Sequence, residues 1–447
     1  MKTTIAFLLA AALGSGFIAG GGAENPAAAS QTLNHPKLGA HLKSFALEKE
    51  ARANAATNEL PVDFKAFFAA AAAGDWPAVS NRFKEFFNHA EQYEHSGKTD
   101  ERLRGPAWEA VKEIWGAFDG FFAGDAKYSA AFGQAIIKSI PPGSIYFGGT
   151  DPGRFIISAL CKSQAKGDPF FTLTQNPLAD QFYLEYLRTI YGGKIHLPTA
   201  ADLQTCFEQY VADMQKRQAE NRLNPGEIFK VDNGEVRISG ETSVMEINGL
   251  LARIIFDRNP SREFYIEESD PLEWTYPHLE PHGLIFKINR QPLAKLSEAA
   301  VKRDHDYWVK TVEPMIGGWL HTDTPLEKTT RFAKKIFLQH DYSGFEGDLR
   351  FVQNDYSSRI FSWERASIAG LYVWRMNHAA SAEEKNRMAD EADFAFRQAL
   401  ALCPSNSEAA KSYGNFLKSK NRDGDAALVD EMTKQFPKKK NKIGSYF

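Results

Sequence analysis

The chain has 447 residues, of which 43% are apolar and 24% charged, and its net charge is −3. These values are typical of a folded globular protein, and the 13% of aromatic residues argues against extensive disorder. No basic stripe of the kind that nucleic-acid-binding proteins carry is present, and the basic run Lys438–Lys442 is interpreted as a solvated tail, so no nucleic-acid partner is expected.

The first residues have the pattern of a secretory signal peptide. Lys2 supplies a positive charge, Ile5–Leu13 is an unbroken apolar run, and Gly21 and Ala23 are small residues at positions suited to cleavage. Glycines interrupt the second half of the apolar stretch, which favours cleavage over retention as a membrane anchor. No later segment approaches the roughly 20 apolar residues of a membrane span. We therefore expect removal of residues 1–23 and a soluble mature protein, periplasmic or secreted.

Residues 24–138 are predicted to form a flexible leader followed by a helical segment. Phenylalanines recur at helical spacing on both sides of Gly74-Asp75-Trp76, which predicts two antiparallel helices joined by a turn. A further helix with an aromatic stripe is expected to begin at Pro106. We interpret these stripes as core packing.

Residues 139–291 are predicted to form an α/β core. Short apolar runs alternate with helical patterns, and a β-α-β-α order implies parallel strands. A separate hairpin is indicated by Asp232-Asn-Gly between two β-like runs. The sequence therefore predicts a mostly parallel sheet with flanking helices. The expected strands are 144–147, 170–174, 263–267 and 284–288.

Two helix starts in this core are predicted from capping residues. Asn176, followed by Pro177, is expected to cap one helix, and Thr199 with Asp202 is expected to open another. Residues 292–447 are predicted to be helical and tetratricopeptide-like, because Pro404 and Pro437 are spaced close to the roughly 34-residue period of that repeat. With about two units, the pairs are expected to cap the core rather than to form a long peptide groove.

Polar residues follow the predicted strands, where open α/β sheets bind ligands. If the strands are neighbours, these side chains share one crevice, in which helix N-termini could bind an anion or a sugar hydroxyl and paired carboxylates could do acid–base chemistry. The alternative is structural: Asp151 and Asn176 as ordinary helix caps, and the acids after 263–267 as a polar loop. The ligand-binding candidates are Thr150, Asp151, Arg154, Gln175, Asn176, Glu267 and Glu268.

Other site chemistries are not supported by the sequence. The loop Gly148–Gly153 has neither the Gly-Lys-Ser/Thr of a phosphate loop nor the glycine order of a dinucleotide site. His278, Glu280 and His282 are separated by prolines, so no metal site and no cofactor are expected. A disulfide between Cys161 and Cys206 is left open, and buried free thiols are the simpler interpretation.

Several of these segments resemble one known family. Pro142–Phe155, Phe171–Leu187 and Glu263–Ile288 are similar to the soluble domain that follows the membrane spans in bacterial protein O-mannosyltransferase-like proteins, in which tetratricopeptide-like helices commonly follow. The resemblance covers roughly residues 105–436. The family's transmembrane part, where glycosyl transfer is expected, is absent, so the resemblance implies shared ancestry without inherited transferase activity. Asp151 is carried over as a ligand-contacting acid.

These observations lead to three functional hypotheses. The first is an exported, non-catalytic binding or scaffold protein, whose crevice contacts a glycan or polar ligand and whose helical tail contacts a protein. The second is an enzyme acting on a glycan, with Asp151 and either Glu267 or Glu268 as its carboxylate pair. The third is an accessory subunit of a membrane glycosyltransferase. No catalytic motif commits the chain to a reaction, so the first is preferred.

Overall fold

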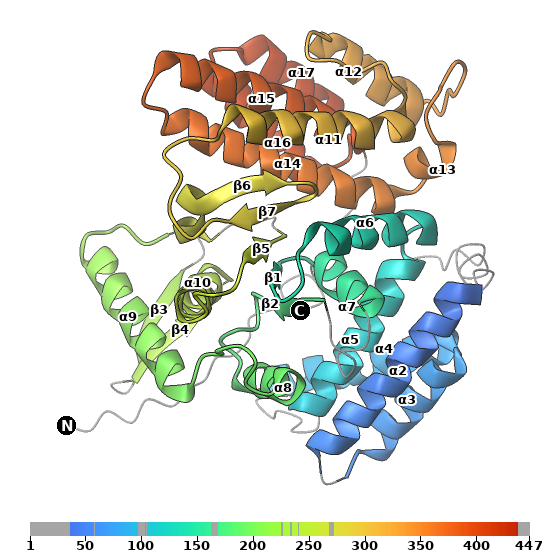
Figure 1. The fold of residues 1–447 in the computed structure, drawn as a ribbon, viewed down its shortest axis with the longest axis vertical. Coiled ribbons are helices and arrows are strands. Elements are labelled where there is room, and N and C mark those ends of the chain that lie inside the picture. The colour runs from blue at the N-terminus through green and yellow to red at the C-terminus, as the bar shows by residue number, and fades with distance from the viewer. Residues whose placement is uncertain are drawn as a thin grey trace.

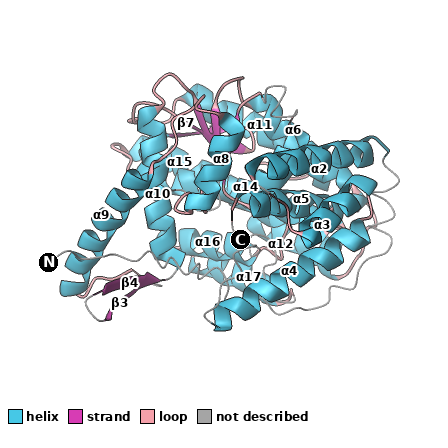
Figure 2. Cartoon of the chain, turned by 90° about the horizontal axis from the view of Figure 1, so that it is seen from below, coloured by secondary structure: helices cyan, strands magenta, loops and turns pink. Residues whose placement is uncertain are grey.

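The computed structural model describes residues 36–57, 59–96, 103, 105–161, 169–224, 227–232, 235–239, 241–267 and 272–436. The predicted signal peptide and Glu268 lie outside these residues. Helices dominate the described part of the chain, around one small sheet and one separate hairpin (Figures 1 and 2). The predicted fold class, α/β with a mostly parallel sheet, is therefore wrong: the protein is mostly helical.

The N-terminal helices pack around the predicted phenylalanine stripes. Gly74, at a φ of 77°, ends one helix in a left-handed conformation that glycine adopts without strain. Phe83 stacks on Trp115 with ring centroids 4.6 Å apart, so the antiparallel pair packs on the helix that follows it. The elements are α2 (Pro36–Ala56), α3 (Val62–Ala73), α4 (Trp76–Ser96), α5 (Pro106–Phe122) and α6 (Ala126–Ser139).

The sheet has five strands in the order β2-β1-β5-β7-β6. β2, β1 and β5 are parallel, whereas β7 pairs antiparallel with both β5 and β6. The mixed direction arises because β6 returns into β7 through a tight turn at Gly283, with a φ of 69°, and no crossover helix intervenes. The strands are β1 (Ile145–Gly148), β2 (Phe171–Thr174), β5 (Phe264–Ile266), β6 (Leu279–His282) and β7 (Ile285–Ile288).

The four predicted strands of the core are present, but β6 was missed. Pro281 lies inside it, and a proline in a strand usually indicates a loop. It is tolerated here because β6 is an edge strand of the sheet. The predicted hairpin is also present, but it forms a two-stranded sheet of its own from β3 (Ile228–Asp232) and β4 (Glu235–Ser239).

The segments that connect the strands of the sheet form helices. Thr199 and Asp202 form the predicted capping box of α9, in which the Thr199 N–H donates to the Asp202 carboxylate at 2.8 Å. The cap predicted at Asn176 is wrong, because α8 is capped instead by Asp180, which accepts from the Phe182 N–H at 2.8 Å. The elements are η2 (Pro152–Ile156), α7 (Ile157–Leu160), α8 (Gln181–Tyr191), α9 (Ala200–Ala219), α10 (Glu241–Arg258) and η4 (Glu273–His278).

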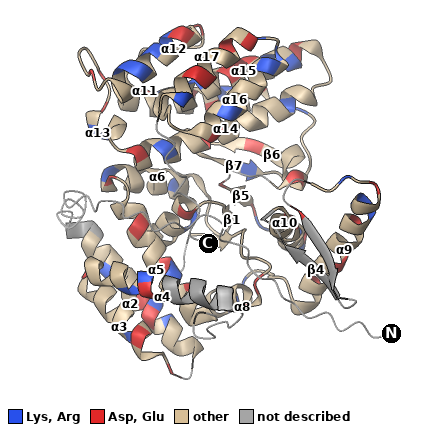
Figure 3. Cartoon of the chain, turned by 180° about the vertical axis from the view of Figure 1, so that it is seen from behind, with Lys and Arg blue, Asp and Glu red and all other residues tan. Residues whose placement is uncertain are grey.

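The C-terminal part is a stack of helices, of which the last four, between Asp355 and Lys434, are joined by short turns. α14 packs against α15, and α16 packs against α14, α15 and α17. Both basic and acidic residues occur on these helices (Figure 3). The elements are α11 (Glu298–Ile316), α12 (Leu326–Ala333), η5 (Lys334–Leu338), α13 (Leu349–Val352), α14 (Asp355–Asn377), α15 (Ala382–Leu402), α16 (Ser407–Ser419) and α17 (Asp423–Lys434).

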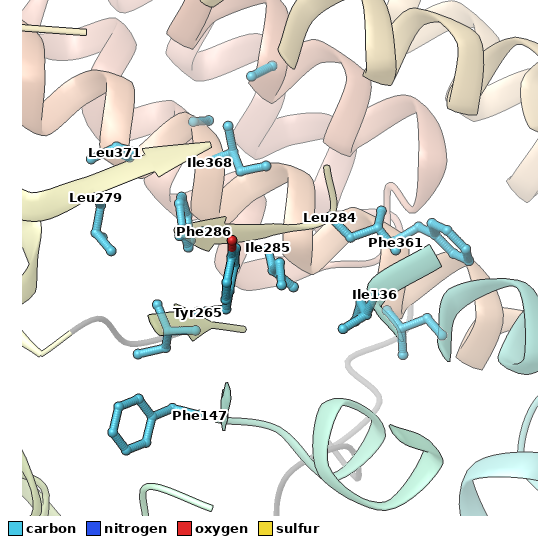
Figure 4. Close-up of a cluster of buried hydrophobic side chains, with 14 of the residues drawn as sticks. Ile136, Phe147, Tyr265, Leu279, Leu284, Ile285, Phe286, Phe361, Ile368 and Leu371 are labelled. Carbon is cyan, nitrogen blue, oxygen red and sulfur yellow. The ribbon is translucent and has the colours of Figure 1, made fainter. Parts of the chain in front are cut away.

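The sheet and the C-terminal stack share one hydrophobic core. Ile368 and Leu371 of α14 lie beside Phe286 of β7 in a cluster that continues to α6 (Figure 4). The Arg375 guanidinium donates hydrogen bonds to backbone carbonyls of the sheet segment, including Leu293 at 2.7 Å and Leu279 at 3.1 Å. α14 is therefore fastened to the sheet by both apolar packing and hydrogen bonds. A second cluster fills the block from α2 to α7.

Within the described ranges, no helix combines the length and the apolar character that a bilayer crossing requires. All three cysteines are buried and none is bridged, so the disulfide that the sequence left open between Cys161 and Cys206 is not formed.

The buried thiols lead to a prediction about reactivity. Burial raises the pKa of the Cys206 thiol to about 11 and also raises the pKa of Cys403. Because the thiolate is the reactive form, we expect native protein to react with a thiol-specific chromogenic reagent at least about 100-fold more slowly than a free thiol. Denatured protein should release colour equivalent to all three cysteines. A single reactive thiol after denaturation without reductant would instead reveal a disulfide.

Candidate functional site

The predicted strand tips lie side by side at one edge of the sheet. β1 is hydrogen-bonded to β2 on one side and to β5 on the other, and all three run in the same direction. The pairing continues past the strands, because Gln175 N–H donates to the Gly148 carbonyl at 3.3 Å and Glu267 N–H to the Phe147 carbonyl at 2.9 Å. The structure thus brings together the segments that carry most of the predicted ligand-binding residues.

The loop after β1 encloses the Glu267 carboxylate. One carboxylate oxygen accepts from the backbone N–H groups of Gly149, at 2.7 Å, and Thr150, at 2.9 Å, and the Thr150 hydroxyl donates to the other oxygen. Glu267 has 0% of its surface exposed, and Thr150 is also buried. The backbone donors of the loop Gly148–Gly153 are therefore directed at an acid of the protein itself.

Glycines permit this close approach. A Cβ atom on Gly153 would lie 2.0 Å from the Glu267 Cδ, and one on Gly149 would lie 2.9 Å from the Glu267 carbonyl oxygen. Side chains at these positions would collide with the enclosed residue. The glycine-rich loop that lacks a phosphate-loop signature thus surrounds an internal carboxylate.

Sequence reasoning missed a second acid at this place. Glu364 of α14 is buried, with 3% of its surface exposed, and its side chain influences the pKa of Glu267. Burial raises the pKa of Glu267, and interactions with Thr150, Glu364 and Gly149 offset only part of this effect. The sequence did contain a signal for this residue. Glu364 lies at helical spacing between the core residues Phe361 and Ile368, and a charged side chain on a buried helix face usually has a partner.

Gln175 and Asn176 both lie near the loop Gly148–Gly153, but they differ in burial and in hydrogen bonding. Gln175 is buried, whereas Asn176 is half-buried and its side-chain amide donates to the Gly149 carbonyl at 3.4 Å. The Asn248 side chain of α10 in turn donates to the Asn176 carbonyl and accepts from the Ala179 N–H at 2.8 Å. The Gln175 Oε1 and Asn176 Oδ1 atoms have no hydrogen-bond partner in the described part of the chain.

Arg154 and Asp151 do not have the positions that were predicted for them in a shared crevice. Arg154 is buried, and its guanidinium lies 4.4 Å from the Phe155 ring and within 3.4 Å of the Glu109 carboxylate. Asp151 is half-buried, and its side chain does not cap η2, so it is not the ordinary helix cap that the alternative interpretation proposed. The predicted candidates therefore do not all face one hollow.

Arg154 belongs instead to a buried charge network between α2, α5 and α8. Lys49 pairs with Glu113 and donates to the Tyr186 hydroxyl at 3.0 Å, and Tyr186 donates to Glu113 at 2.6 Å. Burial opposes ionisation of Glu113, but Lys49 and Arg154 outweigh it and lower the pKa of that carboxyl. The network fastens the N-terminal helices to the rest of the fold.

The histidine-rich segment, for which the sequence predicts no metal site, places two of its histidines next to backbone carbonyls. His278 Nδ1 lies 2.7 Å from the Asn289 carbonyl, and His282 Nε2 lies 2.8 Å from the Ser139 carbonyl. No group of three or more metal-ligating side chains occurs among the residues that the structure describes.

A scan against protein-family models and searches of curated proteins and of solved structures found no match for this chain. The resemblance to the soluble domain of bacterial protein O-mannosyltransferase-like proteins thus stays a prediction.

Proposed function

We propose that this chain is an exported binding or scaffold protein whose C-terminal helices α14–α17 contact a protein partner. The observation that carries the proposal is the stacking of these helices, in which α16 packs against α14, α15 and α17. Repeat proteins use successive helix pairs of this kind to present extended binding surfaces. Export is supported by the pattern of Lys2 and the apolar run that follows it.

Exposed positions of the stack lie on α15, α16 and α17, whereas α14 has none before its last residue. α14 packs on the sheet through Ile368 and Arg375. On α16, Lys411, Asn415 and Lys418 are exposed at spacings that place them on one helix face. This face offers hydrogen-bond donors and positive charge, which suits a partner surface rich in carboxylate or carbonyl oxygens.

Contact of the strand-tip region with a glycan or polar ligand is a second part of the proposal. It rests on Asp151 and Asn176, which are half-exposed, because Thr150, Gln175 and Glu267 are buried. Catalysis on a glycan by Asp151 and Glu267 would require Glu267 to leave its hydrogen bonds with Gly149 and Thr150, so we favour binding over catalysis.

Charge reversal on α16 tests the proposal. Tagged wild type, Lys411→Glu/Lys418→Glu and a control, Lys216→Glu/Lys310→Glu, would be used to capture partners from the native host. The control reverses two exposed lysines on α9 and α11, outside the proposed contact, and its net charge change is the same. We expect wild type and control to retain one common partner, whose dissociation constant the α16 variant raises at least about tenfold.

Equal capture by both variants would contradict a partner site on α16. In parallel, glycan-array binding by wild type and Asp151→Ala tests the strand-tip part of the proposal. Equal binding by the two proteins, or no binding by either, would remove that part.

A further inference from the structure

The sheet ends at β2, whose outer edge faces side chains and not another strand. Within the described ranges, β2 pairs with β1 on one side only. The Phe171 N–H donates to the Ser144 carbonyl at 2.9 Å, on the side of β1. Backbone groups of successive strand residues point to opposite sides, so the N–H groups of Thr172 and Thr174 point away from β1.

Two tyrosine hydroxyls of α8 bind these outward groups. The Tyr191 hydroxyl accepts from the Thr172 N–H at 2.9 Å and donates to the Thr172 carbonyl at 2.8 Å. The Tyr183 hydroxyl accepts from the Thr174 N–H at 2.7 Å. A tyrosine hydroxyl both donates and accepts, so a single side chain satisfies both backbone groups of one strand residue. Tyr191 thus binds the two groups of Thr172 that a neighbouring strand would bind.

Packing holds both hydroxyls in place. Tyr183 and Tyr191 are 2% and 4% exposed and lie about two helical turns apart on α8. The Tyr191 ring meets the Phe171 ring edge to face, with centroids 5.1 Å apart. The Arg154 guanidinium lies 5.6 Å from the Tyr183 ring. The cover over β2 is therefore a buried part of the fold.

The opposite edge of the sheet has a different protection. β6 contains Pro281, which has no N–H to offer, and its Leu279 carbonyl accepts from Arg375 at 3.1 Å. Free strand edges pair readily with other chains, and proteins prevent this with prolines or with covering elements. β2 has no proline, and its sequence Phe-Thr-Leu-Thr is rich in residues that favour strands. Its edge therefore depends on the cover from α8.

We propose that Tyr183 and Tyr191 take the place of a further strand and keep the edge of β2 from pairing with a second copy of this chain. A second copy fits this edge because the edge is self-complementary. In an antiparallel pair about a two-fold axis, Thr172 of each copy would exchange N–H and carbonyl bonds with Thr172 of the other. These are the two groups that Tyr191 binds within one chain.

Tyr191→Phe tests the proposal because it keeps the ring and removes the hydroxyl. Tyr210→Phe is the matched control: Tyr210 of α9 is also buried, and its hydroxyl also has two partners, Glu227 at 2.7 Å and Ser243 at 2.9 Å. Analytical ultracentrifugation of the full chain would compare both variants with wild type over a range of concentrations. We expect Tyr191→Phe to raise the self-association constant at least about tenfold, and more when it is combined with Tyr183→Phe.

The control is expected to associate no more than wild type does. Equal association of Tyr191→Phe and Tyr210→Phe would overturn the proposal, because it would show that loss of any buried hydroxyl is sufficient. Unchanged association of the double variant Tyr183→Phe/Tyr191→Phe would overturn it as well.

Amide hydrogen exchange of the wild type gives a second test that does not depend on folding of a variant. The Thr172 and Thr174 amides should be protected to within about tenfold of the Phe171 amide, which pairs with β1. In Tyr191→Phe, the Thr172 amide should exchange at least about tenfold faster, whereas the Phe171 amide should not change. Exchange of both threonine amides in the wild type at the rate of an unstructured peptide would overturn the proposal.

Discussion

Replacing Asp304 by asparagine is expected to lower the free energy of unfolding by about 3–5 kcal/mol, because it leaves the Arg365 guanidinium buried without a counter-charge. Arg365 Nη1 lies 2.8 Å from Asp304 Oδ2, and neither side chain has any exposed surface. The Tyr372 hydroxyl donates to the same carboxylate oxygen at 2.8 Å. Denaturant unfolding monitored by tryptophan fluorescence would measure the loss.

A matched control lies two residues further along the same helix. Asp306 pairs with Lys302 at 2.6 Å, but both side chains are largely exposed. Asp306→Asn is therefore expected to change stability by less than about 1 kcal/mol. Similar losses in the two variants would show that Asp304 does not balance a buried charge. Asp304→Leu combined with Arg365→Met should cost less than Asp304→Asn, because it removes both charges together.

Gly153→Ala is expected to destabilise the protein by about 3 kcal/mol or more, since overpacking is added to the loss of buried hydrogen bonds. The new Cβ would lie 2.0 Å from the Glu267 carboxyl, which fills the space beside the glycine. Glu267 cannot move aside without losing its bonds to Gly149 and Thr150. Thermal and denaturant unfolding of the variant would measure the effect.

Gly370→Ala makes the same chemical change within α14, where nothing lies within 4 Å of the new Cβ. Alanine favours a helix interior over glycine, so this control is expected to stabilise the protein by about 0.5–1 kcal/mol. The opposite signs distinguish crowding at Gly153 from a general effect of alanine. If Gly153→Ala were neutral, the loop after β1 would not need a glycine at this position.

The local features of the fold were predictable from the sequence, and the long-range ones were not. Thr199 and Asp202 predicted a helix start because a capping box involves residues three apart in the chain. The direction of β7 was not predictable from its own residues, since it depends on the connection through η4 and β6. Pro281 concealed β6, because whether a proline suits a strand depends on which strands flank it.

For the site, too, features set by neighbouring strands were predicted, whereas features set by residues far along the chain were not. Adjacency of Thr150 and Glu267 followed correctly from the expected parallel pairing of their strands. The burial of Thr150 and Glu267 was not predicted. It depends on covering elements such as α14, which lies far along the chain and carries Glu364. Arg154 was expected in the crevice, but its direction is set by Glu109, an acid in a helix that precedes the sheet.

The contact between α14 and the sheet limits how this protein could have changed during evolution. Helical arrays commonly lengthen by duplication of a pair, and each added pair must find an apolar neighbour on both sides. Here Ile368 and Leu371 already have Phe286 as their neighbour, so a pair inserted before α14 would separate the array from the strands. Units added after α15 would leave this contact in place, whereas a replacement at Phe286 would have to be matched by a change of volume on α14.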